Sequence, residues 1–210
     1  MKKLIPLFFC ILSSSSFAQN VIPAFDPVTW KPPYSLSLDG WGIERFLVPP
    51  DFAPLIKYTG VEDIRFTKGW GDVKSDEYWT YAFLWYLDGK PTVDTAIIET
   101  NLNAYYDGLI KTNIDKRKIP AEKIFATKAT IKKINSLDGD MSTFSGSIKM
   151  LDYMQQKSNI LNCIIHLKYC DGQDKTFLFY EISPQPPTHQ VWQSLDKLWK
   201  DFNCKESVTK

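Results

Sequence analysis

The sequence predicts an α+β fold, built mainly from an antiparallel sheet with two long helices and one short helix packed on it. Two observations lead to this prediction. Four segments with strand character follow one another in the C-terminal half, separated by turn residues, and long helical periodicity occurs only outside this run. Strands gathered in one run favour an α+β fold over an α/β fold, in which strands and helices alternate.

The N-terminus has the three zones of a secretory signal peptide over residues 1–18. Two lysines precede an apolar stretch, and Ser16 and Ala18 place small residues where signal peptidase reads them. The apolar stretch is about half as long as a membrane-spanning helix. We therefore expect a mature chain that begins at Gln19, lacks a membrane span, and is periplasmic or secreted.

The next region is expected to be an arm followed by a hairpin. Residues 19–36 contain four prolines and little periodicity, which is typical of an extended arm. Asp39-Gly40 then lies between alternating apolar segments at 35–38 and 41–48. Because Asp-Gly is a strong signal for a two-residue turn, we expect these segments to pair with each other.

The middle of the chain is expected to hold the short helix, two strands and the first long helix. We place the short helix at 51–58 and the strands at 61–68 and 78–87. Asp94 is a suitable N-cap for an amphipathic helix at 95–111, in which apolar residues recur at helical spacing.

The C-terminal part predicts a four-stranded antiparallel meander followed by the last helix. The four strands are expected at 124–135, 142–152, 160–169 and 176–182. Thr188 is the expected cap of the last helix, which should turn an apolar face to the sheet. That face carries Val191, Leu195, Leu198 and Phe202. We expect residues 37–210 to form a single domain, with two subdomains joined near 112–123 as the alternative.

Charge and cysteine content narrow the class of protein. Loss of the two signal-peptide lysines takes the basic residues from 25 to 23, against 24 acidic residues. A near-neutral chain without a basic run argues against nucleic acid as a partner. Of the three remaining cysteines, Cys170 and Cys204 are expected to form a disulfide at the ends of a strand and a helix. Cys163 is expected to be a buried, inert thiol.

The candidate binding site lies in residues 68–89, KGWGDVKSDEYWTYAFLWYLDG, which carry seven aromatic side chains. Strand alternation places residues 79, 81, 83 and 85 on one face. One interpretation is an exposed aromatic platform beside the loop at 69–76, with at least one tryptophan open to solvent. The alternative is that these rings are ordinary core. The residues proposed to bind a ligand are Trp70, Asp72, Trp79, Tyr81 and Trp85.

The sequence is compatible with three functions. The preferred one is a non-enzymatic exported binding domain for a small molecule, a saccharide or an envelope protein. The second is an envelope or saccharide hydrolase that uses the loop carboxylates Asp72, Asp76 and Glu77. The third is a protein-binding inhibitor or immunity-type module with a preformed sheet surface.

No motif points to catalysis. His166 and His189 lack the spacing of a zinc site, and no phosphate-binding loop or nucleophile elbow is present. We assign no catalytic residue, no metal ligand and no cofactor.

Overall fold

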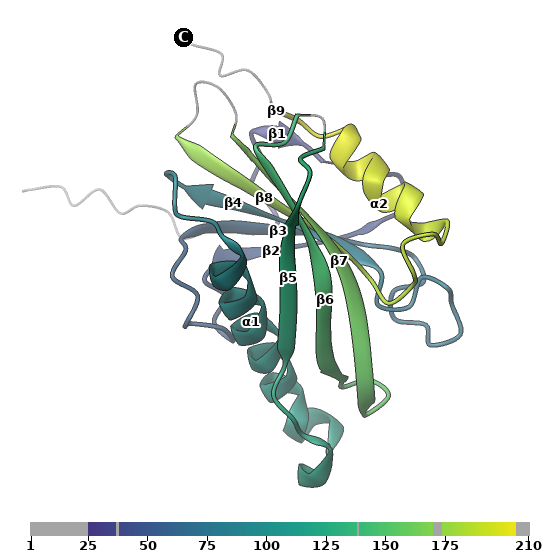
Figure 1. Cartoon of the computed structure of the whole chain (residues 1–210). Helices are drawn as coiled ribbons and strands as arrows, with labels where there is room; N and C mark the ends of the chain where they lie inside the picture. Colours follow the sequence, from purple (N-terminus) through teal and green to yellow (C-terminus); the bar gives the residue numbers. More distant parts are fainter. Residues whose placement is uncertain (1–24, 37, 138, 170–173, 205–210) are drawn as a thin grey trace, which may run out of the picture.

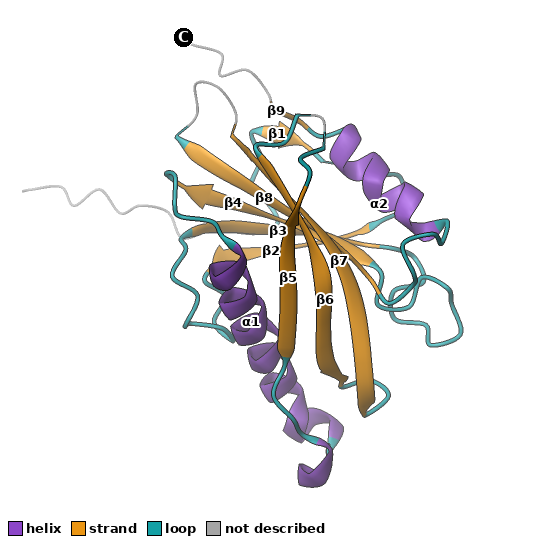
Figure 2. Cartoon of the chain, in the orientation of Figure 1, coloured by secondary structure: helices purple, strands orange, loops and turns teal. Residues whose placement is uncertain are grey.

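A computed structural model describes residues 25–36, 38–137, 139–169 and 174–204. A seven-stranded antiparallel sheet forms the centre of the protein, with two helices and a 3-10 turn packed on it (Figures 1 and 2). The predicted α+β class is confirmed. Among the described residues, no helix has the length and apolar character needed to cross a membrane.

The sheet has the strand order β2-β3-β4-β8-β7-β6-β5. The first three strands form one meander, helix α1 crosses to the far edge, and the last four strands return to β4. The strands are β2 (Gly42–Val48), β3 (Gly60–Phe66), β4 (Tyr81–Asp88), β5 (Lys128–Ile134), β6 (Ser142–Asp152), β7 (Lys157–Tyr169) and β8 (Lys175–Ser183). The predicted C-terminal meander is therefore confirmed as β5 to β8.

Helix α1 (Thr95–Arg117) begins where the sequence predicts. The Asp94 side chain accepts a hydrogen bond from the Ile97 amide at 2.8 Å, which satisfies a donor that the first helical turn leaves free. The helix runs six residues past its predicted end and stops at Lys118, which has a left-handed backbone. A 3-10 turn (Ala121–Lys123) then leads into β5.

Helix α2 (Val191–Lys200) begins later than predicted. Its N-cap is Gln190, whose side chain makes no capping hydrogen bond, and the Val191 amide donates to His189 Nδ1 instead. The assignment of Thr188 as the cap is wrong. The predicted apolar face is correct, since Val191, Leu195, Leu198 and Phe202 are all buried.

Each helix covers a different face of the sheet. Tyr81, Phe83 and Trp85 of β4 join a large core with α1, whereas Ala82 and Leu84 join a second core with α2. This division follows from strand geometry, because successive side chains point to opposite faces. Figure 1 shows the two helices packed against separate parts of the sheet.

Two predictions for the N-terminal region are wrong. The segments around Asp39-Gly40 do not pair with each other, because β1 (Tyr34–Ser35) pairs with β9 (Asn203–Cys204) and β2 pairs with β3. Residues 51–58 form successive turns and no helix. Both signals were local, and long-range strand pairing overrode them.

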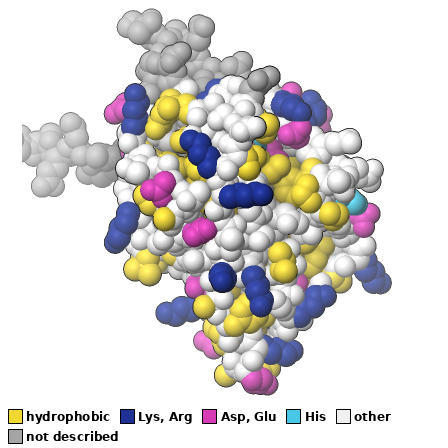
Figure 3. All heavy atoms as spheres, in the orientation of Figure 1, with side chains coloured by type: hydrophobic (Ala, Val, Ile, Leu, Met, Phe, Trp, Pro, Cys, Tyr) yellow, Lys and Arg dark blue, Asp and Glu magenta, His cyan; other side chains and the backbone are white. Residues whose placement is uncertain are grey.

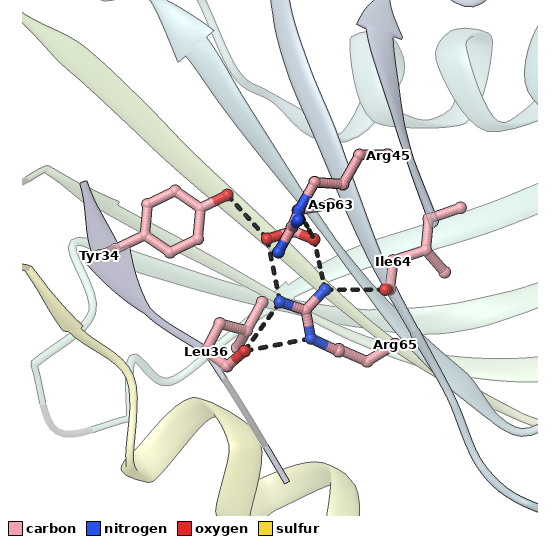
Figure 4. Close-up of polar contacts among 6 residues, drawn as sticks. All are labelled: Tyr34, Leu36, Arg45, Asp63, Ile64 and Arg65. Carbon is pink, nitrogen blue, oxygen red and sulfur yellow. Dashed lines mark hydrogen bonds and ion pairs between the residues drawn. The ribbon is translucent and has the colours of Figure 1, made fainter. Parts of the chain in front are cut away.

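A buried ion-pair network holds the arm against the sheet (Figure 4). Asp63 on β3 accepts hydrogen bonds from Tyr34, Arg45 and Arg65. Arg65 also donates to the Leu36 carbonyl oxygen, at 2.8 Å from Nη2. Because the carboxylate and the guanidinium of Arg65 are both buried, their mutual contacts offset the cost of leaving water.

The cysteine predictions have different outcomes. Cys163 is buried and free, and burial raises the pKa of its thiol to about 12, as expected for an inert cysteine. Cys170 lies outside the described residues, so its pairing with Cys204 stays a prediction. The signal peptide and residues 19–24 also lie outside them.

Candidate functional site

The loop between β3 and β4 brings two of the predicted tryptophans together. The Trp79 amide donates to the Trp70 carbonyl oxygen at 3.0 Å, and the two indole rings lie 5.8 Å apart. Gly69 allows the loop to close, because a Cβ atom there would lie 2.1 Å from Ser75 Oγ. The loop is therefore an ordered structure, and it places both rings on the side of the sheet that α1 covers.

Trp79 adopts a backbone conformation that tryptophan rarely takes. Its φ angle is 55°, in the left-handed region. Such a conformation costs on the order of 1–3 kcal/mol and persists only where the surroundings determine it. Here the ring is 1% exposed and packs on Tyr153, at 5.2 Å between ring centroids. Strand alternation therefore does not place Trp79, since β4 begins only at Tyr81.

A cavity of about 100 Å³ lies between these rings, β2, β3 and α1. Eight of its eleven lining residues are aromatic, and its single charged group is Glu44 of β2. The lining residues are Glu44, Phe46, Phe52, Ile64, Phe66, Trp70, Trp79, Tyr81, Tyr105, Leu109 and Tyr153. This cavity is the candidate site, and we call it the aromatic cavity.

The structure places the five predicted site residues in two groups. Trp70, Trp79 and Tyr81 line the aromatic cavity, whereas Asp72 and Trp85 do not. Trp79 and Trp85 are buried, so the expectation of an exposed platform at these rings is wrong; Trp70 alone is partly exposed. The cover comes from α1, which packs on this face of β4.

The three loop carboxylates are spread over the loop. Asp72 is exposed and accepts a hydrogen bond from the Lys74 amide, and Glu77 accepts one from the Gly69 amide at 2.7 Å. The Asp76 carboxylate lies 4.0 Å from His189 Nε2. Asp72 and Glu77 thus hold the backbone of the loop, a common role for turn carboxylates.

A buried carboxyl group, Glu62, lies behind the cavity wall. It accepts hydrogen bonds from Tyr105 at 2.8 Å and from Trp85 Nε1 at 3.0 Å. Burial raises the pKa of Glu62 to about 8, against the lowering effect of these two hydrogen bonds. Glu62 therefore holds a proton at neutral pH and fixes the two rings that connect β4 to α1.

A second buried polar cluster lies beneath α2 and away from the cavity. His166 Nδ1 lies 2.8 Å from Asp140 and its Nε2 lies 3.4 Å from Glu181. The ring stacks on Trp199, whose Nε1 donates to Asp140 at 2.9 Å. Burial lowers the pKa of His166, but the hydrogen bond with Asp140 and the nearby Glu181 carboxylate outweigh it and raise the pKa to about 8. With no exposed face, this cluster serves packing.

A groove of about 400 Å³ runs along β2 beside the cavity and shares Glu44, Phe46 and Phe52 with it. No strand of the described chain pairs with the outer edge of β2. Ile43 and Leu47 of this strand are 56% and 52% exposed. The opposite edge strand, β5, instead exposes Lys128, Lys132 and Lys133. Lysines on an edge strand discourage pairing. The charged residues of β2 are Glu44 and Arg45, and this strand has no lysine.

The sequence interpretation missed most of the cavity. Glu44, Phe46 and Phe66 come from β2 and β3, and Tyr105 and Leu109 come from α1. Each side chain fits an ordinary strand or helix pattern, so no local signal separates it from core. The Glu62-Asp63 pair was the available clue, because two acidic residues in an apolar strand indicate buried polar partners.

Within the described residues, no group of His, Cys, Asp and Glu side chains could hold a metal ion. Figure 3 shows basic and acidic side chains interspersed over the visible face, with no broad stripe of one sign. No protein-family model, curated protein or solved structure matches this chain.

Proposed function

We propose that this chain is an exported, non-enzymatic binding protein that holds a small ligand in the aromatic cavity beneath α1. The observation that carries the proposal is the cavity itself, a concave aromatic site with one carboxylate, Glu44, in its wall. Trp70, Trp79 and Tyr81 contact the ligand, and the groove along β2 gives it access.

Two local features support a ligand at this position. The indole N–H of Trp70 is buried and donates to no acceptor in the part of the chain that the structure describes. A buried donor without a partner costs about 1–3 kcal/mol, which an oxygen atom of a ligand would recover. The strained backbone of Trp79 is also typical of residues held for a function, since packing alone rarely requires it.

Tryptophan fluorescence tests the proposal. Titration with a neutral probe that has a tert-butyl group should change the emission of Trp70 and Trp79, which line the cavity. Leu109→Phe should abolish this change, because Leu109 is a partly exposed lining residue and the larger side chain fills the space. Circular dichroism and the melting temperature establish that the variant is folded. An unchanged titration in folded Leu109→Phe would contradict the proposal.

A second candidate function is recognition of a polypeptide along β2. The edge of this strand, which no described strand pairs with, and the groove beside it favour addition of an extended segment from another protein. The exposed Ile43 and Leu47 would contact apolar side chains of that segment. This candidate corresponds to the inhibitor or immunity-type module.

Peptide selection separates the two candidates. Peptides selected on the immobilised protein from a random library should protect the amides of β2 from hydrogen exchange. Leu47→Lys should abolish their binding without changing the fluorescence response to the tert-butyl probe. Selected peptides that leave β2 unprotected would exclude this second candidate.

A further inference from the structure

All but one of the aromatic rings that line the cavity have no cation of the described residues over their faces. In the described chain, a Lys or Arg side chain lies over each of seven aromatic rings, those of Trp30, Tyr86, Phe125, Tyr153, Tyr169, Trp199 and Phe202. Of these seven, only Tyr153 lines the cavity, with the Arg117 guanidinium 4.9 Å from its centroid. The rings of Phe66, Trp70 and Tyr81 therefore stand out as aromatic faces without a cation.

Glu44 adds negative charge to these rings. Its carboxylate is exposed and lines both the cavity and the groove, so it lies where the two meet. It makes no hydrogen bond or ion pair with any described residue. No Lys, Arg or His lines the cavity. A carboxylate beside electron-rich ring faces produces a site of negative potential, which attracts a cation.

The size and hydrogen bonding of the cavity restrict the kind of cation. A cavity of roughly 150 Å³ admits benzene, so one of about 100 Å³ admits a compact branched group. The Tyr105 hydroxyl already donates a hydrogen bond to Glu62, and the Tyr81 hydroxyl is hydrogen-bonded to that of Tyr106. Apart from Glu44, where the cavity meets the groove, the side-chain acceptors in the walls are tyrosine hydroxyls, and those of Tyr81 and Tyr105 already take part in hydrogen bonds. The three N–H groups of a primary ammonium would therefore not all find an acceptor, and an unsatisfied buried donor is costly.

We propose that the aromatic cavity binds a quaternary or fully methylated ammonium group, with Glu44 as its counter-ion. Such a group has no N–H donor to satisfy, is compact, and interacts favourably with several ring faces at once. The Trp70 indole N–H is then available for an oxygen atom elsewhere on the same ligand. This inference rests on the proposed function, and it names the ligand class for the same cavity.

The remaining charges near the cavity are compatible with this assignment. Glu62, behind Tyr105, is protonated at neutral pH because burial raises its pKa to about 8, so it adds little charge. Arg117 lies over Tyr153 at one wall and repels a cation there. The methylated group is therefore expected on the side of Phe66 and Trp70, whose ring centroids are 4.7 Å apart.

A matched pair of probes tests the inference. Choline and its tert-butyl isostere, in which carbon replaces the charged nitrogen, have nearly the same shape and differ in charge. Isothermal titration calorimetry of the mature protein should show choline binding about tenfold more tightly than the isostere. Glu44→Gln should remove most of this preference by weakening the binding of choline, because only the charged probe is attracted by the carboxylate. Glu122→Gln, an exposed change outside the cavity, should leave both unchanged.

The outcomes distinguish the inference from the proposed function. Equal affinities for the two probes, both lost in folded Leu109→Phe, would overturn the ammonium assignment and leave ligand binding in the cavity standing. A choline preference that survives Glu44→Gln would also overturn the assignment. Failure of both probes to bind or to change tryptophan emission would overturn the inference and the proposed function together.

Discussion

At the scale of single residues, two buried ionisable groups make the stability of the protein depend on pH. The pKa of Glu62 is raised from 4.5 to about 8, so the folded chain holds a proton that the unfolded chain has lost. The pKa of His166 is raised from 6.5 to about 8, with the same consequence. In both cases the folded state binds more protons, so the free energy of unfolding falls as pH rises toward 8.

We predict that Glu62→Gln removes the part of this decline that begins near pH 5. For each extra proton held by the folded state, the free energy of unfolding falls by about 1.4 kcal/mol per pH unit. Urea unfolding at several pH values should show a decline from about pH 5 in the parent and only above about pH 6.5 in Glu62→Gln. Equal slopes in the two proteins between these values would show that Glu62 is ionised in the fold.

His166 gives a second prediction at this scale. Its ring connects the buried carboxylates Asp140 and Glu181, so His166→Gln leaves both without a cationic partner. Removing one member of a buried ion pair costs about 3–5 kcal/mol, so chemical denaturation at neutral pH should show a loss of that size in the free energy of unfolding. His189→Gln is the control, because His189 is only partly buried and its loss removes a single capping hydrogen bond from the Val191 amide, at a cost of about 1 kcal/mol. Similar losses in both variants would argue against a buried ion pair at His166.

At the scale of elements, the two helices begin in different ways. Asp94 caps α1 by a side-chain hydrogen bond, whereas Thr188 lies two residues before the Gln190 cap of α2 and has no capping role. We predict that Asp94→Ala lowers the free energy of unfolding by about 1 kcal/mol. Thr188→Ala should change it by less than about 0.5 kcal/mol. Chemical denaturation measures both changes. A larger loss of stability in Thr188→Ala would indicate that Thr188 caps α2, as the sequence predicted.

At the scale of the whole molecule, the sheet has one covered region on each face and two unlike edges. Helix α1 packs against the aromatic side of β4, and α2 packs against the other side. The β5 edge carries exposed lysines, and the β2 edge carries exposed apolar residues. The cavity, which Tyr105 and Leu109 of α1 help to line, lies on the α1 side of the sheet, and the groove runs beside it along the β2 edge.

Export is predicted from the N-terminal residues of the sequence. Protein recovered from the periplasm or the medium should begin at Gln19, because Ser16 and Ala18 fit the cleavage positions. N-terminal sequencing checks the cleavage site, and mass spectrometry without reductant checks the predicted Cys170–Cys204 disulfide. An intact Met1 in a membrane fraction would contradict export of a soluble chain.

Local sequence patterns determined the element types where side-chain periodicity and chain-reversing residues agree. The meander from β5 to β8 follows from strand alternation and from the turn-forming residues in the sequence, and the start of α1 follows from Asp94 and helical spacing. The position of the aromatic residues on one side of β4 follows from the same alternation. These features depend on neighbours in the sequence, so a sequence contains them directly.

Only the tertiary structure decided which surface covers which. The Asp39-Gly40 turn did not close a hairpin, because Tyr34 and Ser35 pair with the C-terminal residues 203–204. The rings of β4 became core because α1 lies on their side, and Trp79 joined them through a left-handed backbone. The aromatic cavity exists where β2, β3, the loop and α1 meet. Contacts between segments so far apart depend on how the layers pack, and no local pattern of residues carries that information.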